Sequence, residues 1–190
     1  METNTPEASG SIRMTVFASL MAAMTAAGAY IAIPIGPVPI VLQNLFVLLT
    51  GLLLGPRWGI ASVGVYLLAG VFGLPVFAGG TGGIGHLAGP TGGYLLGYLP
   101  AVAAVGWISA KGGGKIVTDI AALCAGALIV YAAGLPWLAW ITGMPAGKAV
   151  AVGMLPFLPG DALKIAAAVP IARSLRPVLP VPRGKSGSPT

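Results

Sequence analysis

A carboxylate and an ammonium group stand three residues apart in an otherwise apolar stretch near the carboxyl end of the chain. Asp161 follows Pro159 and Gly160, and Lys164 comes one helical turn later. Proline and glycine interrupt the preceding pattern, and a three-residue step places both charges on one face of the helix that follows. Charged side chains inside a membrane are costly and usually functional, so the meaning of this pair depends on the class of protein.

The composition is that of a protein embedded in a lipid bilayer. Hydrophobic residues make up 56% of the 190 residues and charged residues only 7%, with a mean hydropathy of +0.93, whereas soluble domains carry about 25% charged residues. The net charge of +6 is spread over single and paired cations, which argues against nucleic acid as a partner. A single cysteine, Cys124, excludes both a disulfide framework and a cysteine metal site.

Apolar runs between glycine- and proline-rich turns predict an all-α membrane protein with six transmembrane helices. The first run is too long for a cleaved signal peptide, and Glu2 and Glu7 make its leader acidic. We expect residues 1–12 and the basic residues 177–190 to be disordered tails around one domain, 13–176. The six helices are expected near residues 14–33, 40–54, 59–72, 89–107, 116–133 and 160–175, with a short helix at 146–155.

Cations mark one side of the six-helix arrangement, and they predict that both termini are cytoplasmic. Only Lys148 and Lys164 fall on the other side. The cations of the first side are Arg13, Arg57, Lys111, Lys115, Arg173, Arg176, Arg183 and Lys185. Asp119 lies four residues after Lys115, and we expect these two to form a local salt bridge rather than part of a site.

The outward loops and helix ends would bring several polar and aromatic side chains together around Asp161 and Lys164. The residues expected in this pocket are Gln43, His86 at the end of a glycine-rich loop, and the aromatic wall of Tyr66, Phe72, Phe77 and Tyr94. A carboxylate accepts hydrogen bonds from N–H groups, and an ammonium binds a carboxylate. The predicted ligand is therefore small, largely apolar and polar at its ends.

Other readings of the same residues remain open. Asp161 and Lys164 would neutralise each other without a ligand, with Asp161 also capping its helix. Asp161 would also suit the proton site of a self-sufficient carrier, whereas an enzyme using His86 and Asp161 lacks any nucleophile–base or metal spacing. In the first helix Ala18, Ala22 and Ala26 form a stripe of small side chains, which suits packing within this chain or docking to a separate membrane subunit.

Five segments, in order along the chain, resemble the BioY family over about residues 13–176. They are Gly36-Pro37-Val38-Pro39-Ile40-Val41-Leu42-Gln43, Leu53-Leu54-Gly55-Pro56-Arg57, Gly73-Leu74-Pro75-Val76-Phe77, Gly89-Pro90-Thr91-Gly92-Gly93-Tyr94 and Leu155-Pro156-Phe157-Leu158-Pro159-Gly160-Asp161-Ala162-Leu163-Lys164. Members of this family are the biotin-binding S components of energy-coupling factor (ECF) transporters.

The resemblance implies high-affinity biotin uptake across the cytoplasmic membrane of a bacterium or archaeon, with no cofactor and no enzymatic activity. It implies a separate transmembrane T component and two ATP-binding cassette ATPases as partners, with Ala18, Ala22 and Ala26 docking on the T component. Some members are reported to act without these partners, so a self-sufficient vitamin carrier, an S component for another vitamin and a homo-oligomer stay open. Asp161 would bind the ureido group of biotin. The family's cation near the fourth helix has no counterpart here, which leaves Lys164, His86, Tyr94 or backbone amides for the carboxylate.

Overall fold

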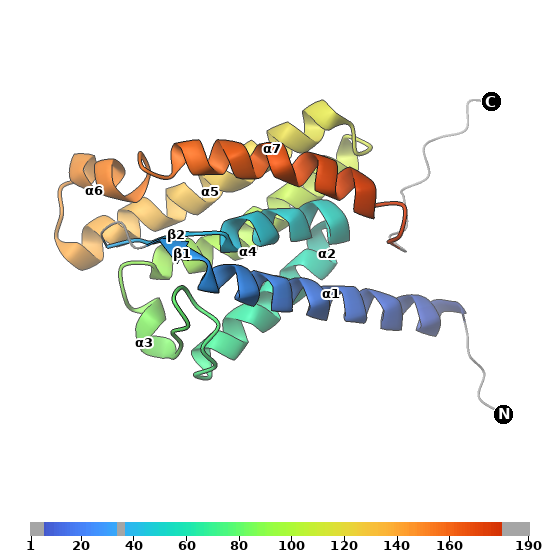
Figure 1. The fold of residues 1–190 in the computed structure, drawn as a ribbon, viewed down its shortest axis with the longest axis horizontal. Coiled ribbons are helices and arrows are strands. Elements are labelled where there is room, and N and C mark those ends of the chain that lie inside the picture. The colour runs from blue at the N-terminus through green and yellow to red at the C-terminus, as the bar shows by residue number, and fades with distance from the viewer. Residues whose placement is uncertain (1–5, 34–36, 180–190) are drawn as a thin grey trace.

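The computed structural model describes residues 6–33 and 37–179, and these residues form a helical bundle (Figure 1). The helices are α1 (Pro6–Tyr30), α2 (Gln43–Val71), α3 (Ile84–Leu87), α4 (Gly92–Lys111), α5 (Ile116–Thr142), α6 (Ala146–Gly153) and α7 (Leu158–Leu175). The strands β1 (Ala32–Ile33) and β2 (Ile40–Val41) pair antiparallel, with Ala32 opposite Val41. Within the described ranges α1, α2, α4 and α5 are long and apolar enough to cross a membrane, and α6 with α7 forms a fifth candidate bent by 49°. The chain is a multi-pass membrane protein.

The long helix α2 is two helical segments joined at a sharp break. Gly55 has φ 73° and ψ −177°, which glycine adopts without the steric cost of a Cβ. A Cβ built on Gly59 would lie 3.7 Å from the Cα of Gly51, whereas eight residues of straight helix rise about 12 Å. Figure 1 shows the second segment turning back toward α3. The predicted turn between two separate helices is therefore confirmed at this point.

One segment differs here from the sequence-based expectation, and two others fall wholly or partly outside the described residues. Residues 6–12, expected in a disordered tail, are the first turns of α1; Pro6 and Glu7 are residues that favour a helix start. The turn expected at 34–39 is flanked by β1 and β2, although 34–36 lie outside the described residues. The tail residues 1–5 and 180–190 also lie outside them.

The fifth predicted helix was expected to end near residue 133, but α5 continues through Pro136 to Thr142. Leu138 is fully buried, and Trp137 Nε1 donates a hydrogen bond to the Gly89 carbonyl at 2.9 Å. In a membrane a proline is tolerated inside a helix when neighbouring groups compensate for the lost hydrogen bond. The contacts of Trp137 and Leu138 thus outweigh the local preference of Pro136 for a loop.

Asp119 has a different partner from the one expected. Arg176 donates from Nη1 to Asp119 Oδ2 at 2.6 Å and from Nη2 to Oδ1 at 2.9 Å, and Ser109 Oγ donates to Oδ1 at 2.6 Å. The predicted Lys115–Asp119 salt bridge is therefore wrong. Asp119 is fully buried, and a bidentate guanidinium satisfies a buried carboxylate better than an exposed lysine on the same helix face. This network ties the end of α7 to α4 and α5.

The small-residue stripe of α1 packs mostly within the chain. Ala18 and Ala22 are 7% and 8% exposed, and Ser62 of α2 donates its hydroxyl to the Ala18 carbonyl at 2.7 Å. Small side chains let the two helices approach this closely. A separate subunit would reach Ala18 and Ala22 only if α1 moved away from α2, while Ala26 is half-buried.

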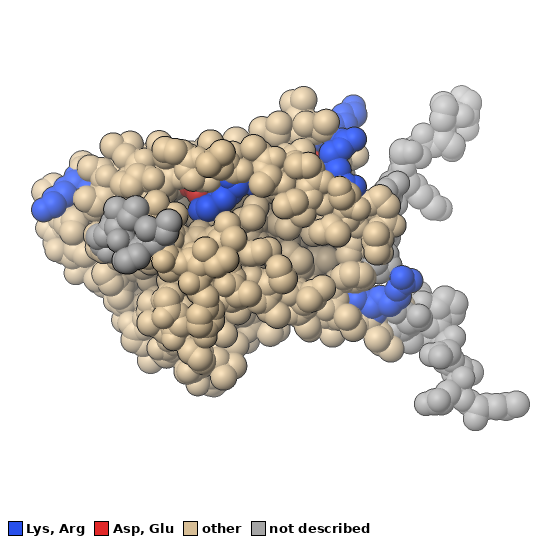
Figure 2. Space-filling view, in the orientation of Figure 1, with Lys and Arg blue, Asp and Glu red and all other residues tan. Residues whose placement is uncertain are grey.

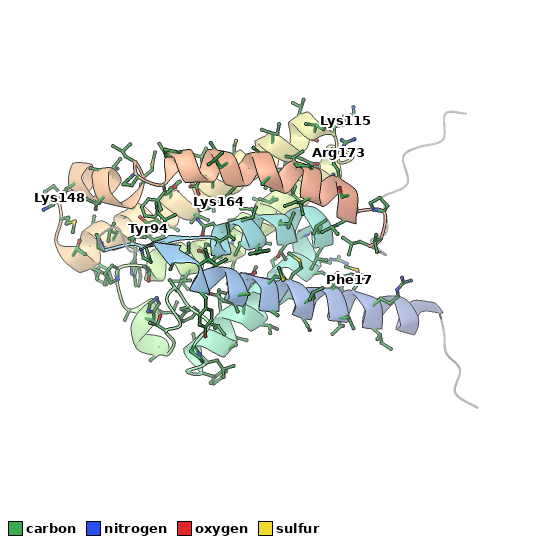
Figure 3. The ribbon with its side chains drawn as sticks, viewed as in Figure 1. Phe17, Tyr94, Lys115, Lys148, Lys164 and Arg173 are labelled. Atoms are coloured by element: carbon green, nitrogen blue, oxygen red, sulfur yellow. The ribbon has the colours of Figure 1, made fainter. Side chains whose placement is uncertain are left out.

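Cations gather toward the two ends of the bundle (Figure 2). Figure 3 places Lys115 and Arg173 together at the end where α7 finishes, and Lys148 at the opposite end beside α6. Lys164 lies between these ends. Arg183 and Lys185 are outside the described residues.

Candidate ligand-binding site

A cavity opens near the end of the bundle that carries α3, α6 and the strand pair. The space between its lining atoms, counted up to the open mouth, is about 510 Å³. Of the predicted site residues, Gln43, His86, Tyr94 and Lys164 line it. The structure adds Asn44, Thr91, Tyr98, Tyr131 and Phe157, among others, to its wall. Residues from helices and loops that are distant in the sequence thus surround one cavity together with Lys164.

Asp161 and Lys164 form a buried ion pair at the start of α7. Lys164 Nζ donates to Asp161 Oδ1 at 3.0 Å, and the hydroxyl of Tyr131 on α5 donates to Asp161 Oδ2. The two residues are 8% and 9% exposed. Lys164 borders the cavity, whereas Asp161 borders a smaller cavity beside it. Asp161 does not cap its helix, because Phe157 is the N-cap residue and no side chain caps there.

Gln43, the first residue of α2, presents an amide group without a partner. The residue is 1% exposed, and its Nε2 makes no hydrogen bond within the part of the chain that the structure describes. Buried polar groups are almost always hydrogen-bonded, and leaving one unpaired costs free energy. Since Gln43 lines the cavity, a ligand oxygen is the natural acceptor for this N–H group.

Tyr94 forms part of the wall from the first turn of α4 (Figure 3). Its hydroxyl donates to the Gly153 carbonyl at the end of α6, at 2.9 Å. A Cβ on Gly134 of α5 would come within 2.4 Å of the Tyr94 ring, so only glycine leaves room for it. Tyr94 thereby connects three helices at the edge of the cavity.

His86 on α3 joins the glycine-rich loop to the start of α4. Its Nδ1 lies 3.1 Å from Thr81 Oγ1 and its Nε2 lies 3.2 Å from Thr91 Oγ1. Because Thr81 donates its own proton to the Ala78 carbonyl, Nδ1–H must donate to Thr81, and Nε2 then accepts from Thr91. Partial burial lowers the pKa of His86 below its usual value, which favours this neutral form.

Three of the predicted wall aromatics lie outside the cavity lining. Phe77 is fully buried behind it and stacks on His86 with ring centroids 5.2 Å apart, and Tyr66 meets Phe77 edge-on. These two rings support the wall from behind. Phe72 is 84% exposed, so its predicted role in the wall is wrong; it follows the last turn of α2, where the chain leaves the bundle.

The sequence reasoning missed Tyr98 and Tyr131 as site residues. Tyr98 donates its hydroxyl to Asn44 Oδ1 and lies one helical turn after Tyr94, a spacing that would have placed both on one face. Tyr131 is the partner of Asp161, but in the sequence it is a single tyrosine in an apolar run and gives no periodic signal. No group of three metal-ligating side chains occurs among the described residues.

Comparisons with known proteins agree on one family. The family model of BioY matches residues 1–181. The chain is 44% identical to the probable biotin transporter BioY of Pyrococcus horikoshii over 160 residues, covering 83% of this chain and 93% of the relative. It is 38% identical to the biotin transporter BioY of Thermotoga maritima over 165 residues, covering 87% and 96% of the two chains.

A solved structure has the same fold. It is the crystal structure of the S-component for biotin from an ECF-type ABC transporter, with a TM-score of 0.84 and 32% sequence identity, covering 93% of this chain and 95% of that one. The helical bundle is therefore similar in the two proteins over most of both chains. With the family model and these relatives matching over most of its length, the chain belongs to the BioY family.

Proposed function

We propose that this protein binds biotin in the cavity beside Lys164 and carries it into the cell as the substrate-specific S component of an ECF-type transporter. The observation that carries this proposal is the buried, unpartnered amide of Gln43 in the same cavity as the Lys164 ammonium. Both groups donate hydrogen bonds, and biotin offers a ureido oxygen and a carboxylate as acceptors. The apolar wall suits its fused thioether ring.

We also propose that Asp161, which borders the smaller cavity beside Lys164, accepts hydrogen bonds from the ureido N–H groups. Its carboxylate already holds Lys164 and Tyr131, but each carboxylate oxygen can accept a second hydrogen bond. Tyr94, Thr91 and His86 enclose the cavity from the α4 side. Phe77 and Tyr66 keep His86 in place from behind.

The chain works in the cell membrane with six spans and both termini in the cytoplasm. Six spans result if the two segments of α2 on either side of Gly55 each count as one and α6 with α7 counts as the last. Most loop cations then lie on the cytoplasmic side. This arrangement is tested in a variant with Cys124 replaced by serine and a single cysteine introduced at Lys148 or Lys115. An impermeant thiol reagent added to intact cells should label the first and not the second; the reverse pattern would contradict the orientation.

The partners are a T component and two ATP-binding cassette ATPases. Docking uses the small-residue side of α1 around Ala26, where the neighbouring Ala23 and Ala27 are exposed. Replacing Ala23 and Ala27 together by tryptophan should abolish co-purification with the T component and leave biotin binding intact. Retained co-purification would place docking elsewhere.

Uptake of labelled biotin into a strain that lacks its own biotin transporter tests the function as a whole. Cells that express the chain with its partners should accumulate biotin, and an ATPase variant without a Walker lysine should not. Accumulation that persists without any ATPase and collapses with the proton gradient would instead favour a self-sufficient carrier. No accumulation under any condition would contradict biotin uptake.

A further inference from the structure

The last turn of α1 is joined by two hydrogen bonds to the glycine-rich loop between α2 and α3 (residues 72–83). The Tyr30 hydroxyl donates to the Pro75 carbonyl at 2.6 Å, and the Gly79 N–H donates to the Ala29 carbonyl at 3.1 Å. The last carbonyls of a helix have no partner within the helix, so the loop satisfies a group that α1 leaves free. The loop and the end of α1 therefore hold each other in place.

The ring of Tyr30 also fixes the backbone of the loop. A Cβ on Gly80 would lie 3.0 Å from Tyr30 Cε1, so the ring lies directly against the backbone there. Its hydroxyl is held at Pro75, and the ring cannot turn away from Gly80 without losing this hydrogen bond. Although Tyr30 is 58% exposed, it thus contacts the loop at two separate points.

The glycine-rich loop connects these contacts to the wall of the ligand cavity. Ala78 of the loop borders the cavity, and His86 borders it from α3, whereas Tyr30 lies outside its lining. The Phe77 N–H donates to the Thr81 carbonyl at 2.8 Å, which closes a tight turn around Ala78. The side chain of Thr81 in turn lies 3.1 Å from His86 Nδ1. A displacement of this turn would therefore move both Ala78 and His86.

The loop has separate anchors on α2. The Gly83 N–H donates to the Gly70 carbonyl at 2.7 Å, and the Tyr66 hydroxyl donates to the Val76 carbonyl at 3.1 Å. Between these two anchors, the backbone that follows Ala78 contacts α1. The part of the loop that borders the cavity thus depends on α1 as well as on α2.

We propose that Tyr30 is a positioning residue for the ligand cavity, which acts on the ligand through the glycine-rich loop without touching it. This inference rests on the proposed biotin function. With the loop held against α1, Ala78 and His86 are in place before the ligand arrives, which saves the cost of ordering them. Coupling between two sites is reciprocal, so a ligand that contacts Ala78 and His86 also orders the end of α1.

Tyr30→Phe tests this role, because it removes the hydroxyl and keeps the ring against Gly80. We expect biotin to bind about 5-fold more weakly, which corresponds to one hydrogen bond of about 1 kcal/mol, chiefly through faster dissociation. Thr15→Val is the matched control, because it removes an exposed hydroxyl of the same helix that donates to the Ser11 carbonyl at 3.0 Å. It should bind as the unsubstituted chain does. Equal affinity of the two variants would overturn the proposal.

Hydrogen exchange of the purified chain separates positioning from general stability. Tyr30→Phe should raise deuterium uptake in residues 75–86 and leave it unchanged in residues 109–119, which lie at the other end of the bundle with Lys115. Biotin should lower uptake at residues 27–31, and less so in Tyr30→Phe. Unchanged uptake in 75–86, or a rise in both segments, would contradict a specific role of Tyr30 at the cavity. The expected rise in a chain that binds no biotin would contradict the proposed function alone.

Gly80→Ala and Gly79→Ala form a second test, which leaves Tyr30 unchanged and decides even if Tyr30→Phe fails to fold. The two glycines have φ 74° and 71°, so an added Cβ causes similar backbone strain at each. A Cβ on Gly80 meets the Tyr30 ring at 3.0 Å, whereas one on Gly79 meets nothing within 4 Å. We expect Gly80→Ala to bind biotin about 5-fold more weakly than Gly79→Ala. Equal affinities would show that the contact between Tyr30 and the loop does not determine the site.

Discussion

Single residues determine what the ligand cavity can hold. Lys164 and Gln43 present hydrogen-bond donors from two different helices, and the Lys164 ammonium is oriented by the Asp161 carboxylate at 3.0 Å. Asp161 is fixed in turn by Tyr131. A side chain held in this way needs no reorganisation when the ligand arrives, which favours affinity.

Removing either charge of the pair should weaken biotin binding strongly. Asp161→Asn keeps the shape of the side chain but leaves Lys164 unpaired, and Lys164→Ala leaves the carboxylate with Tyr131 alone. Truncating one partner of a buried charged pair costs about 2 kcal/mol or more, roughly 30-fold in affinity. Calorimetry on both variants checks this, with Lys148→Ala as the control because Lys148 is an exposed cation on α6. Undiminished binding by Asp161→Asn would remove Asp161 from the site.

His86 should make biotin binding sensitive to acid. Burial lowers the pKa of His86 from its usual 6.5, so the neutral ring is favoured in the folded state. The hydrogen bond that the neutral ring accepts from Thr91 is lost as the pH falls through this lowered pKa, below about 6.5. Protonation replaces the Nε2 lone pair that accepts from Thr91 by a second donor. Affinity should drop between pH 7.5 and pH 5 in the unsubstituted chain and change less in His86→Gln. A parallel pH dependence in the two proteins would show that His86 is not the titrating group.

At the scale of helices, the site depends on close packing that only glycine permits. α4 and α5 approach at Gly134, whose missing Cβ leaves space for the Tyr94 ring. α2 and α4 approach at Gly106, where a Cβ would come within 2.5 Å of Pro56 N at the break in α2. Tyr94 and Tyr98, which both line the ligand cavity, therefore owe their positions to neighbouring helices.

Gly134→Ala should displace Tyr94. The added Cβ would lie 2.4 Å from the ring, and overpacking of this kind costs about 1–3 kcal/mol. We expect a lower unfolding temperature and biotin binding weakened about 10-fold, because a loss of about 1.4 kcal/mol raises the dissociation constant tenfold. Gly147→Ala on α6 is the matched control, because a Cβ there meets nothing within 4 Å. Equal behaviour of both variants would mean that Tyr94 adapts without loss.

The Asp119–Arg176 network should stabilise the opposite end of the bundle. Arg176→Ala leaves a fully buried carboxylate uncompensated, and breaking such a pair costs about 3–5 kcal/mol. Thermal unfolding in detergent should show a large decrease, whereas Lys115→Ala, which removes only an exposed cation, should have little effect. Biotin affinity should hardly change, because the network lies away from the cavity. A large loss for Lys115→Ala would restore the local salt bridge that the sequence suggested.

Much of this helix arrangement follows from sequence, and the exceptions share a cause. Gly55 and Pro56 mark the break in α2, and Pro159 and Gly160 mark the start of α7 within two residues. Pro136 failed as a helix end, because tertiary contacts of Trp137 and Leu138 override a local signal. Asp119 and Tyr131 find partners from distant helices. Such pairings depend on three-dimensional packing that residue spacing does not encode.

At the scale of the whole molecule, the two ends of the bundle have different tasks. The end with α3, α6 and the strand pair holds the cavity, and Lys115 and Arg173 lie together at the other end (Figure 3). Polar side chains that line the cavity, such as Gln43 and His86, lie near the first end. The Asp119–Arg176 network connects the helices at the second end. In the orientation proposed above, the site faces outward and the basic face lies toward the cytoplasm.

Titration of the purified chain with biotin in a calorimeter tests the central claim most directly. We expect saturable binding of one biotin per chain, with the heat abolished or greatly reduced in Asp161→Asn and retained in Lys148→Ala. Valerate alone should bind far more weakly, because it lacks the ring end. A chain that shows a native unfolding transition but no heat with biotin, or the same heat with an unrelated vitamin, would contradict the assignment of this cavity to biotin.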